Sequence, residues 1–456
     1  MKHDFENKKV SDIKIAYIGG GSRGWAWGLM SDLAAADDIS GDVYLYDIDQ
    51  AAADSNEIIG NKYNDCPGAS KWVYHSAKTA KEAYENADFV VISILPATFD
   101  EMESDVHAPE KYGIWQPVGD STGPGGILRA MRTVPMYEEI GECIKKYCPN
   151  AWVINYTNPM TMCVRTLYRV FPKIKAFGCC HEVFGSQKLL SDVVEEEMGI
   201  KVESFKDIKV NIVGVNHFTW FTKAKYMGID LFPYLDKYIE KHYGEKELAV
   251  DVNFDLYKRY GVMAVAGSRH LAEFCEGKWY LENPDEIERW NFKLTPVSQR
   301  KEWQAGSLSR SRNLLDGTEQ VKINKSGEEG VLQIRSLLGL CGEFVTNVNL
   351  PNVGQIPNLP LGAVVECNVV ISGDSVSPVM AGAVPTQILP LVSRMCYEHE
   401  ALNDAIAARD IERIFNIFAS SQLVTCSLSE ARTLFKEMVN NTKEYLKSYD
   451  LSILEK

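Results

Sequence analysis

The first half of the chain alternates short apolar runs with longer amphipathic stretches. Apolar runs rich in β-branched and aromatic residues indicate buried strands, and apolar residues recurring every three or four positions indicate helices. Buried strands are predicted at residues 13–18, 43–47, 88–95, 151–155 and 174–179. Helices are predicted between them at residues 26–36, 51–63, 77–86, 134–148 and 161–171. This alternation predicts a doubly wound parallel sheet of the α/β class.

After about residue 200 the alternation of strand and helix stops. Strands are predicted at residues 209–215, 218–226 and 361–371, and helices at residues 385–399, 402–408 and 410–419. A chain of 456 residues is too long for one ordinary core. We therefore expect two domains, an α/β domain over residues 1–200 and a mixed α+β domain over residues 201–456 that serves substrate binding and oligomerisation.

A glycine-rich loop lies between the first predicted strand and the first predicted helix. Its sequence satisfies the pattern G-x-G-x-x-G with Gly19, Gly21 and Gly24, and Ser22 and Arg23 complete it. The first glycine permits the tight turn, and the second lets the backbone approach a pyrophosphate that rests on the helix N-terminus. The context of strand, loop and helix therefore predicts a Rossmann-like dinucleotide site in residues 1–200.

An acidic residue stands where such a site needs one. Asp47 ends the second predicted strand, where a carboxylate accepts hydrogen bonds from the ribose hydroxyls. An acid at this position favours NAD over NADP. Asp49 is a rival for the same role.

Composition and charge narrow the range of partners. Hydrophobic residues make up 45% and charged residues 24% of the chain, as in ordinary globular proteins. The formal charge of −14 argues against a nucleic-acid or anionic-membrane surface. No apolar run reaches the roughly 18 residues of a membrane span, and the polar segment 1–9 lacks the apolar core of a signal peptide. Eleven cysteines without a framework spacing indicate reduced thiols, so a cytoplasmic location is expected.

Two strand ends carry side chains with metal-binding chemistry. Cys180 and His181 follow the strand predicted at residues 174–179, and His217 follows the strand predicted at residues 209–215. Ligands of open α/β sheets bind at the carboxyl ends of the strands. A thiolate and an imidazole there suit a shared divalent metal with positions left for a substrate. A buried apolar thiol and a hydrogen-bonded histidine are the alternative interpretation.

Seven segments together resemble glycoside hydrolase family 4, the NAD-dependent and metal-dependent glycosidases. In chain order they are residues 18–24, Gly-Pro-Gly-Gly at 123–126, Asn-Tyr-Thr-Asn-Pro at 155–159, Cys180-His181, Asn216-His217, Arg269-His270 with Glu273, and the Asn-Leu-Pro segments between 349 and 360. They span most of the chain. The resemblance implies a Rossmann-like sheet similar to that of lactate and malate dehydrogenases, with NAD and a divalent metal, usually Mn²⁺, as cofactors.

The resemblance also implies roles for single residues. Cys180 and His217 match the metal ligands, and His181 matches the catalytic acid. Asn158 matches a substrate-binding asparagine, and Asp120 matches an acid that supports the catalytic base.

The base itself departs from the family pattern. Many members have a tyrosine near residues 262–266, and this chain has none there. Tyr260, Tyr257 and His270 are the nearest alternatives, and the sequence leaves the choice among them open.

The residue after the metal cysteine sorts the members of the family. Forms with Cys-Asp or Cys-Asn resemble 6-phospho-glycosidases, and forms with Cys-His resemble enzymes of unphosphorylated α-glycosides. The tetrapeptide Cys-His-Glu-Val at residues 180–183 resembles the α-galacturonidase subgroup. A small uronide substrate needs a cation for its carboxylate, and Arg269, Arg129 and Arg23 are candidates.

The family chemistry is an exception to the usual hydrolysis of glycosides by two carboxylates. The resemblance implies that NAD⁺ takes a hydride from sugar C3, the base removes the C2 proton, the C1 substituent leaves, and the hydride returns after water adds. It also implies a homodimer or homotetramer. The same chemistry on an α-glucoside, α-galactoside or α-glucuronide, a plain 2-hydroxyacid dehydrogenase and an NAD-sensing binding protein are the alternatives.

Overall fold

The apolar runs of the first half form the centre of a ten-stranded sheet in the computed structural model, which describes residues 1–455. The strand order is β14-β13-β12-β7-β6-β5-β2-β3-β4, and β1 pairs with β2. The parallel strands are β2 (Lys9–Ile18), β3 (Ile39–Tyr46), β4 (Trp72–Ser76), β5 (Phe89–Ile92), β6 (Trp152–Asn155) and β7 (Lys175–Gly178). The antiparallel strands are β1 (Lys2–Asp4), β12 (Phe344–Pro351), β13 (Val364–Ser372) and β14 (Ser375–Pro378).

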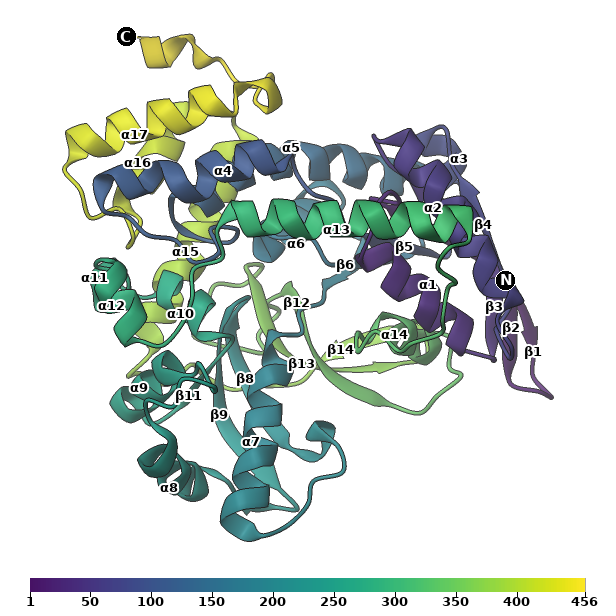
Figure 1. Ribbon diagram of the computed structural model, residues 1–456, viewed down its shortest axis with the longest axis horizontal. Helices are drawn as coiled ribbons and strands as arrows, with labels where there is room; N and C mark the ends of the chain where they lie inside the picture. The colour runs from purple at the N-terminus through teal and green to yellow at the C-terminus, as the bar shows by residue number, and fades with distance from the viewer. Residues whose placement is uncertain (456) are drawn as a thin grey trace.

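Helices connect the parallel strands and cover both faces of the sheet (Figure 1). They are α1 (Trp25–Ala35), α2 (Gln50–Lys62), α3 (Ala80–Tyr84), α4 (Phe99–His107), α5 (Gly123–Tyr147), α6 (Met160–Val170) and α7 (Glu182–Met198). The predicted doubly wound α/β fold is confirmed. The prediction missed β1, β4, α4 and α7, and it began α5 only at residue 134. A Gly-Pro-Gly-Gly start is typical of a loop, although proline also suits the first turn of a helix.

A smaller antiparallel sheet lies beside the large one. It contains β8 (Lys209–Val215), β9 (Phe218–Tyr226), β10 (Ile229–Asp230) and β11 (Met263–Val265). The predicted strands at residues 209–215 and 218–226 are confirmed as a hairpin with a two-residue connection. That connection carries His217, so the hairpin presents this side chain at a defined point.

The remaining helices surround the two sheets. They are α8 (Phe232–His242), α9 (Asp251–Tyr260), α10 (Ser268–Phe274), α11 (Gly277–Tyr280), α12 (Pro284–Arg289), α13 (Val297–Asp316), α14 (Gly330–Leu337), α15 (Leu389–Ala407), α16 (Ile411–Ser420) and α17 (Leu428–Asn441). The helices predicted at residues 385–399 and 402–408 are one helix, α15. In Figure 1, α13 runs as a long green helix in front of the sheet and ends near α2.

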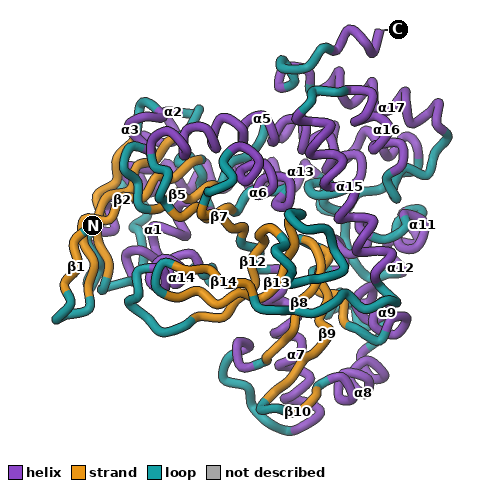
Figure 2. The backbone as a smooth tube through the Cα atoms, turned by 180° about the vertical axis from the view of Figure 1, so that it is seen from behind, coloured by secondary structure: helices purple, strands orange, loops and turns teal. Residues whose placement is uncertain are grey.

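The large sheet continues across residue 200. Figure 2 shows the orange strands passing from β2, β5 and β7 to β12 and β13. The apolar cluster below these strands joins Ile15 and Val91 of the first half to Val348 and Val369 of the second. The division into residues 1–200 and 201–456 stays a prediction, and one sheet and one core are shared by both segments.

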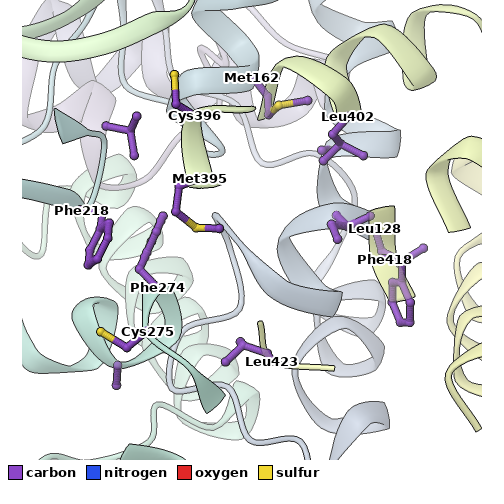
Figure 3. Close-up of a cluster of buried hydrophobic side chains, with 14 of the residues drawn as sticks. Leu128, Met162, Phe218, Phe274, Cys275, Met395, Cys396, Leu402, Phe418 and Leu423 are labelled. Carbon is purple, nitrogen blue, oxygen red and sulfur yellow. The ribbon is translucent and has the colours of Figure 1, made fainter. Parts of the chain in front are cut away.

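A second large core holds the helices of the C-terminal half against the sheet. Figure 3 shows Phe218 and Phe274 side by side, with Met395 next to them. The two rings stack with centroids 5.4 Å apart. Burying each such side chain stabilises the fold by about 1.5–3 kcal/mol. Phe218 follows His217 directly, so this packing also fixes the hairpin end.

The cysteines form no framework of cross-links in the described chain. All eleven are free thiols, as predicted. Among residues 1–455, none of the helices has the combination of length and apolar composition needed to span a bilayer.

Candidate active site

The glycine loop has the close approaches that its sequence predicts. Gly19 has a φ of +92°, and a Cβ there would lie 1.9 Å from the carbonyl oxygen of Ser93. A Cβ on Gly21 would lie 2.6 Å from the Cβ of Ala52. At Gly24 nothing comes within 4 Å, and no side chain caps α1 there. The loop therefore packs tightly on one side and leaves the helix N-terminus open, as an anion-binding turn requires.

Asp47 and Asp49 have different tasks in the structure. The Asp47 carboxylate accepts hydrogen bonds from the backbone N–H of Gly21 at 2.8 Å and of Asp49 at 2.9 Å. Asp49 is the N-cap of α2 and accepts from the N–H of Ala52 at 3.1 Å. Asp47 thus faces the glycine loop, whereas Asp49 belongs to the helix cap.

Asn56 of α2 is a further support of the loop that sequence reasoning missed. Its amide donates to the carbonyls of Gly20 at 2.8 Å and Ser22 at 2.9 Å, and it accepts from the indole N–H of Trp27 at 2.8 Å. Asn56 is fully buried. Its position, two turns into a helix, gave no motif signal, because the contact joins segments far apart in the chain.

The carboxyl side of the sheet gathers Asp120, His217 and His270. Each offers one ligand atom, and these atoms lie within 4.8 Å of one another. The two imidazole rings have centroids 3.9 Å apart. The Ser121 hydroxyl lies 2.7 Å from the Asp120 carboxylate and 3.0 Å from His217 Nδ1. The loop before α5, the β8–β9 hairpin and α10 thus bring three predicted residues into one group.

Burial and neighbouring charges set the protonation of this group. Burial lowers the pKa of His217 to about 3, and the adjacent His270 lowers it as well, so the His217 imidazole is neutral. Burial raises the pKa of Asp120, but His217, His270 and Arg129 lower it, and the net pKa lies below the ordinary value. A carboxylate beside a neutral imidazole is a donor set suited to a divalent cation.

Polar side chains around this group are held in place from two sides. The side-chain amide of Asn158 donates to the Asp120 carboxylate at 3.3 Å, and the backbone carbonyl of Asn158 accepts from Arg129 Nε at 3.0 Å. On the other side, the carboxylate of Glu182 lies 3.8 Å from His270 Nε2. The predicted substrate residue Asn158 therefore lies beside Asp120.

Several buried polar atoms near this group have no hydrogen-bond partner among the described residues. They are Asn158 Oδ1, Asn216 Oδ1, His270 Nδ1 and Glu273 Oε2. Burying a polar atom without a partner costs about 1–3 kcal/mol. Their concentration here indicates a place where a ligand completes the hydrogen bonds.

Cys180 lies outside the group of Asp120, His217 and His270 but beside the hairpin. Asn216, which precedes His217, makes a side-chain hydrogen bond with the Cys180 thiol, and Glu366 is its strongest charged neighbour. Burial raises the pKa of this thiol well above its ordinary value. Asn347 donates to the Cys180 carbonyl at 3.1 Å and to Glu366 at 2.7 Å. Sequence reasoning singled out neither Glu366 nor Asn347.

His181 is the exposed member of the predicted set. Its Nδ1 pairs with Glu328 at 2.9 Å, and its ring lies 6.1 Å from that of Trp25. The hydrogen bond with Glu328 raises the pKa of His181 above its ordinary value, which favours the protonated imidazole. Trp25 opens α1, and His181 therefore lies toward the glycine loop.

The two tyrosine candidates for the base lie elsewhere. Tyr257 donates to the carbonyl of Phe232 at 3.3 Å, and the ring of Tyr260 packs edge-on against Trp220. None of their contacts in the part of the chain that the structure describes involves Asp120 or His217. His270 is the base candidate that the structure places in the group.

The candidate cations for a uronate carboxylate are also separated. Arg269 is exposed and donates to the hydroxyl of Thr295. Arg129 is buried beside Asn158 and Asp120, and Arg23 stays in the glycine loop. Only Arg129 of these three touches the group around Asp120.

The fold and the site define a Rossmann-like α/β protein with a half-buried carboxylate and two buried histidines at the edge of its sheet. Residues 14–196 match the profile of the family 4 glycosyl hydrolases, and residues 212–424 match that of their C-terminal domain. The chain therefore belongs to the family 4 glycosyl hydrolases, and the glycoside hydrolase class predicted from the sequence is confirmed.

Individual relatives agree with this family. The α-galacturonidase of Thermoanaerobacterium saccharolyticum is 53% identical over 98% of this chain and 99% of its own. The α-galacturonidase of Bacillus subtilis is 48% identical over 95% of this chain and 98% of its own. The crystal structure of the Bacillus subtilis protein LplD superposes with a TM-score of 0.89 at 47% identity and covers 94% of this chain and 100% of that one.

Proposed function

We propose that this glycoside hydrolase cleaves α-galacturonides with a bound NAD and a divalent metal. The observation that carries the proposal is the identity of 48–53% with α-galacturonidases over nearly the full length of both chains. Identity falls to 28% with the α-galactosidase of Bacillus subtilis and to 24% with its maltose-6′-phosphate glucosidase. The tetrapeptide Cys-His-Glu-Val supports the same choice.

The glycine loop fits a dinucleotide. Gly19 and Gly21 pack against Ser93 and Ala52 where a Cβ would clash, and α1 begins at an open N-terminus beside Gly24, which suits a pyrophosphate. Asp47 faces the loop, which favours the ribose hydroxyls of NAD. A 6-phospho-β-glucosidase of Thermotoga maritima with manganese, NAD⁺ and glucose-6-phosphate has the same fold, with a TM-score of 0.77 at 20% identity over 95% of this chain and 99% of its own.

The donors around His217 fit a divalent cation. We assign Cys180 and His217 as its ligands, because Asn216 joins the thiol to the hairpin that carries the neutral His217 imidazole. A thiolate and an imidazole can both ligate a first-row divalent metal, and two protein ligands leave positions for sugar oxygens. The Oδ1 atoms of Asn158 and Asn216 have no hydrogen-bond donor in the fold, and the hydroxyl groups of a sugar or the water molecules of a hydrated cation would supply one.

When bound, NAD supplies hydride transfer and the cation supplies Lewis-acid polarisation of sugar oxygens. His270 takes the proton from sugar C2, and the Asp120 carboxylate beside it stabilises the imidazolium that forms. His181 gives a proton to the departing glycosidic oxygen, and its pairing with Glu328 favours the protonated form by raising the pKa of the imidazole. Asn158 and Ser121 orient these groups.

An assay with a chromogenic α-galacturonide tests this proposal. With NAD⁺, Mn²⁺ and a thiol reductant, the protein should release nitrophenol, and in D₂O the sugar product should carry deuterium at C2. Removing NAD⁺ or chelating the metal should abolish turnover. Cleavage that survives both treatments would refute the mechanism, and accumulating NADH would indicate a dehydrogenase. Exclusive activity on a 6-phosphorylated glycoside would refute the substrate class.

A further inference from the structure

One guanidinium of the site was not a candidate from the sequence. Arg300 lies in the first turn of α13 and is half-buried. Its Nη2 donates weakly to the carbonyl of Val118 at 3.4 Å. Its Nε is buried and has no hydrogen-bond partner, and no carboxylate of the described residues forms a salt bridge with it. A buried cationic donor without an acceptor is costly, so this position points to a missing anion.

The other buried arginines of this region already have acceptors. Arg132 forms a bidentate pair with Asp105, and both side chains are about as buried as the core. Arg129 donates to the carbonyl of Asn158 and lies beside the Asp120 carboxylate. Both arginines therefore have acceptors within the fold, whereas the buried Nε of Arg300 has none.

Arg300 belongs to the same site as the catalytic candidates. Its acceptor Val118 is two residues from Asp120, in the loop that leads into α5. Arg129 interacts electrostatically with both Asp120 and Arg300. Glu273 lies close by, but its Oε1 is taken by the N–H groups of Val118 and Gly119 at 2.7 and 2.8 Å, and its Oε2 forms no hydrogen bond. Glu273 attracts the Arg300 guanidinium electrostatically but forms no hydrogen bond with it, so Arg300 Nε keeps no acceptor.

The backbone that carries Arg300 is held firmly. The N–H of Thr295 donates to the carbonyl of Pro117 at 3.1 Å, and the N–H of Val297 donates to His107 at 3.2 Å. Val297 is fully buried against α4. The guanidinium with its unpartnered Nε is therefore presented from a fixed helix end, as a preorganised binding group requires.

We propose that Arg300 binds the C6 carboxylate of the substrate and thereby selects uronides over neutral hexosides. The inference rests on the proposed α-galacturonidase function and adds the residue that recognises the acid group. A guanidinium and a carboxylate form short, charge-assisted hydrogen bonds, often two in parallel. The neutral hydroxymethyl group of a galactoside offers no charge to this position.

Steady-state kinetics of Arg300→Met and Arg300→Lys on matched substrates test the proposal. On a nitrophenyl α-galacturonide, R300M should lower kcat/KM about 10- to 100-fold, mainly through KM, the size of a lost charged hydrogen bond. R300K should recover part of that loss, because it keeps the charge but not the planar fork. The relative activity on the matching α-galactoside should rise in R300M. Competition by free galacturonate should weaken in parallel, whereas competition by galactose should not change.

Arg312→Met is the matched control, since Arg312 is an exposed arginine of the same helix. It should leave KM for the galacturonide unchanged. The role of Arg300 is overturned if R300M has the urea stability, the KM and the galacturonate inhibition of the wild type. In that case the turnover of the wild-type protein still supports the proposed function. If the wild-type protein cleaves no α-galacturonide, the proposed function fails, and the role of Arg300 falls with it. R300K provides the same comparison if R300M does not fold.

Discussion

At the scale of single residues, the site combines groups that the chain keeps far apart. Asp120, His217 and His270 come from a loop, a hairpin and a helix, yet their ligand atoms lie within 4.8 Å. His217 has a φ of +63°, a left-handed conformation that non-glycine residues rarely adopt. Such backbone conformations cluster at functional sites because the surrounding packing holds them, here through the buried Phe218.

The metal ligands and the base are separable by mutation. Because the thiol is assigned to the cation and His270 to the proton, Cys180→Ala should weaken Mn²⁺ binding at least tenfold. His270→Asn should keep Mn²⁺ affinity within a few-fold and should abolish C2 deuterium exchange. Titration calorimetry with Mn²⁺ and mass analysis of the product in D₂O measure the two effects.

His217→Ala serves as the positive control, since His217 is a ligand in both candidate metal sites and its loss should remove metal binding in either case. Wild-type Mn²⁺ affinity in Cys180→Ala, together with loss of binding in His270→Asn, would show instead that Asp120, His217 and His270 hold the cation. The ligand atoms of these three residues lie close enough together to hold a cation, so the experiment distinguishes this arrangement from ligation by Cys180 and His217.

At the scale of elements, the glycine loop depends on the second helix as well as on its own glycines. Asn56 of α2 bonds the carbonyls of Gly20 and Ser22 and the indole of Trp27, so it ties the loop to both α1 and α2. The motif therefore describes only the strand, the turn and the first helix of a larger unit.

Replacing Asn56 by alanine tests this dependence. Asn56→Ala leaves two carbonyls and one indole N–H without a partner, so the free energy of unfolding should fall by about 2 kcal/mol. NAD⁺ should bind about tenfold more weakly, because the loop then loses its fixed shape. Urea unfolding and calorimetry measure the two quantities.

Asn61→Ala is the control for the same helix. Asn61 also makes three hydrogen bonds, to Glu57 and Tyr74, but it lies away from the loop. It should lose comparable stability and keep its NAD⁺ affinity. Equal affinity in both variants would contradict the role assigned to Asn56.

At the scale of the whole molecule, the two halves of the chain share one sheet. β12 lies next to β7, and the apolar cluster below the sheet takes Val331, Ile334, Val348 and Val369 from the second half. The first half alone therefore lacks both a covered sheet edge and part of its core.

A fragment of residues 1–200 should consequently fail to form a stable domain. We expect a gradual loss of helical signal in urea and binding of an apolar dye, whereas the full chain should unfold cooperatively and bind little dye. Circular dichroism and dye fluorescence provide the comparison. A steep unfolding transition of the fragment, with a slope appropriate to its size, would show that residues 1–200 are an independent domain.

Local pattern alone determined much of this protein. The alternation of strand and helix, the glycine loop with Asp47, and the family motifs at Cys180, Asn216 and His217 are readable because periodicity and short motifs act over neighbouring residues. Most of the strands and α-helices before residue 200 follow from that signal, and so does the family.

The tertiary structure decided what depends on long-range contact. It placed His270, and neither tyrosine, beside Asp120, gave Asn56 its hold on the glycine loop, and turned Arg300 toward the same loop as Asp120. It also carried β12 and β13 into the first sheet. Each of these contacts joins segments tens to hundreds of residues apart, and the packing that pairs them leaves no periodic trace in either segment.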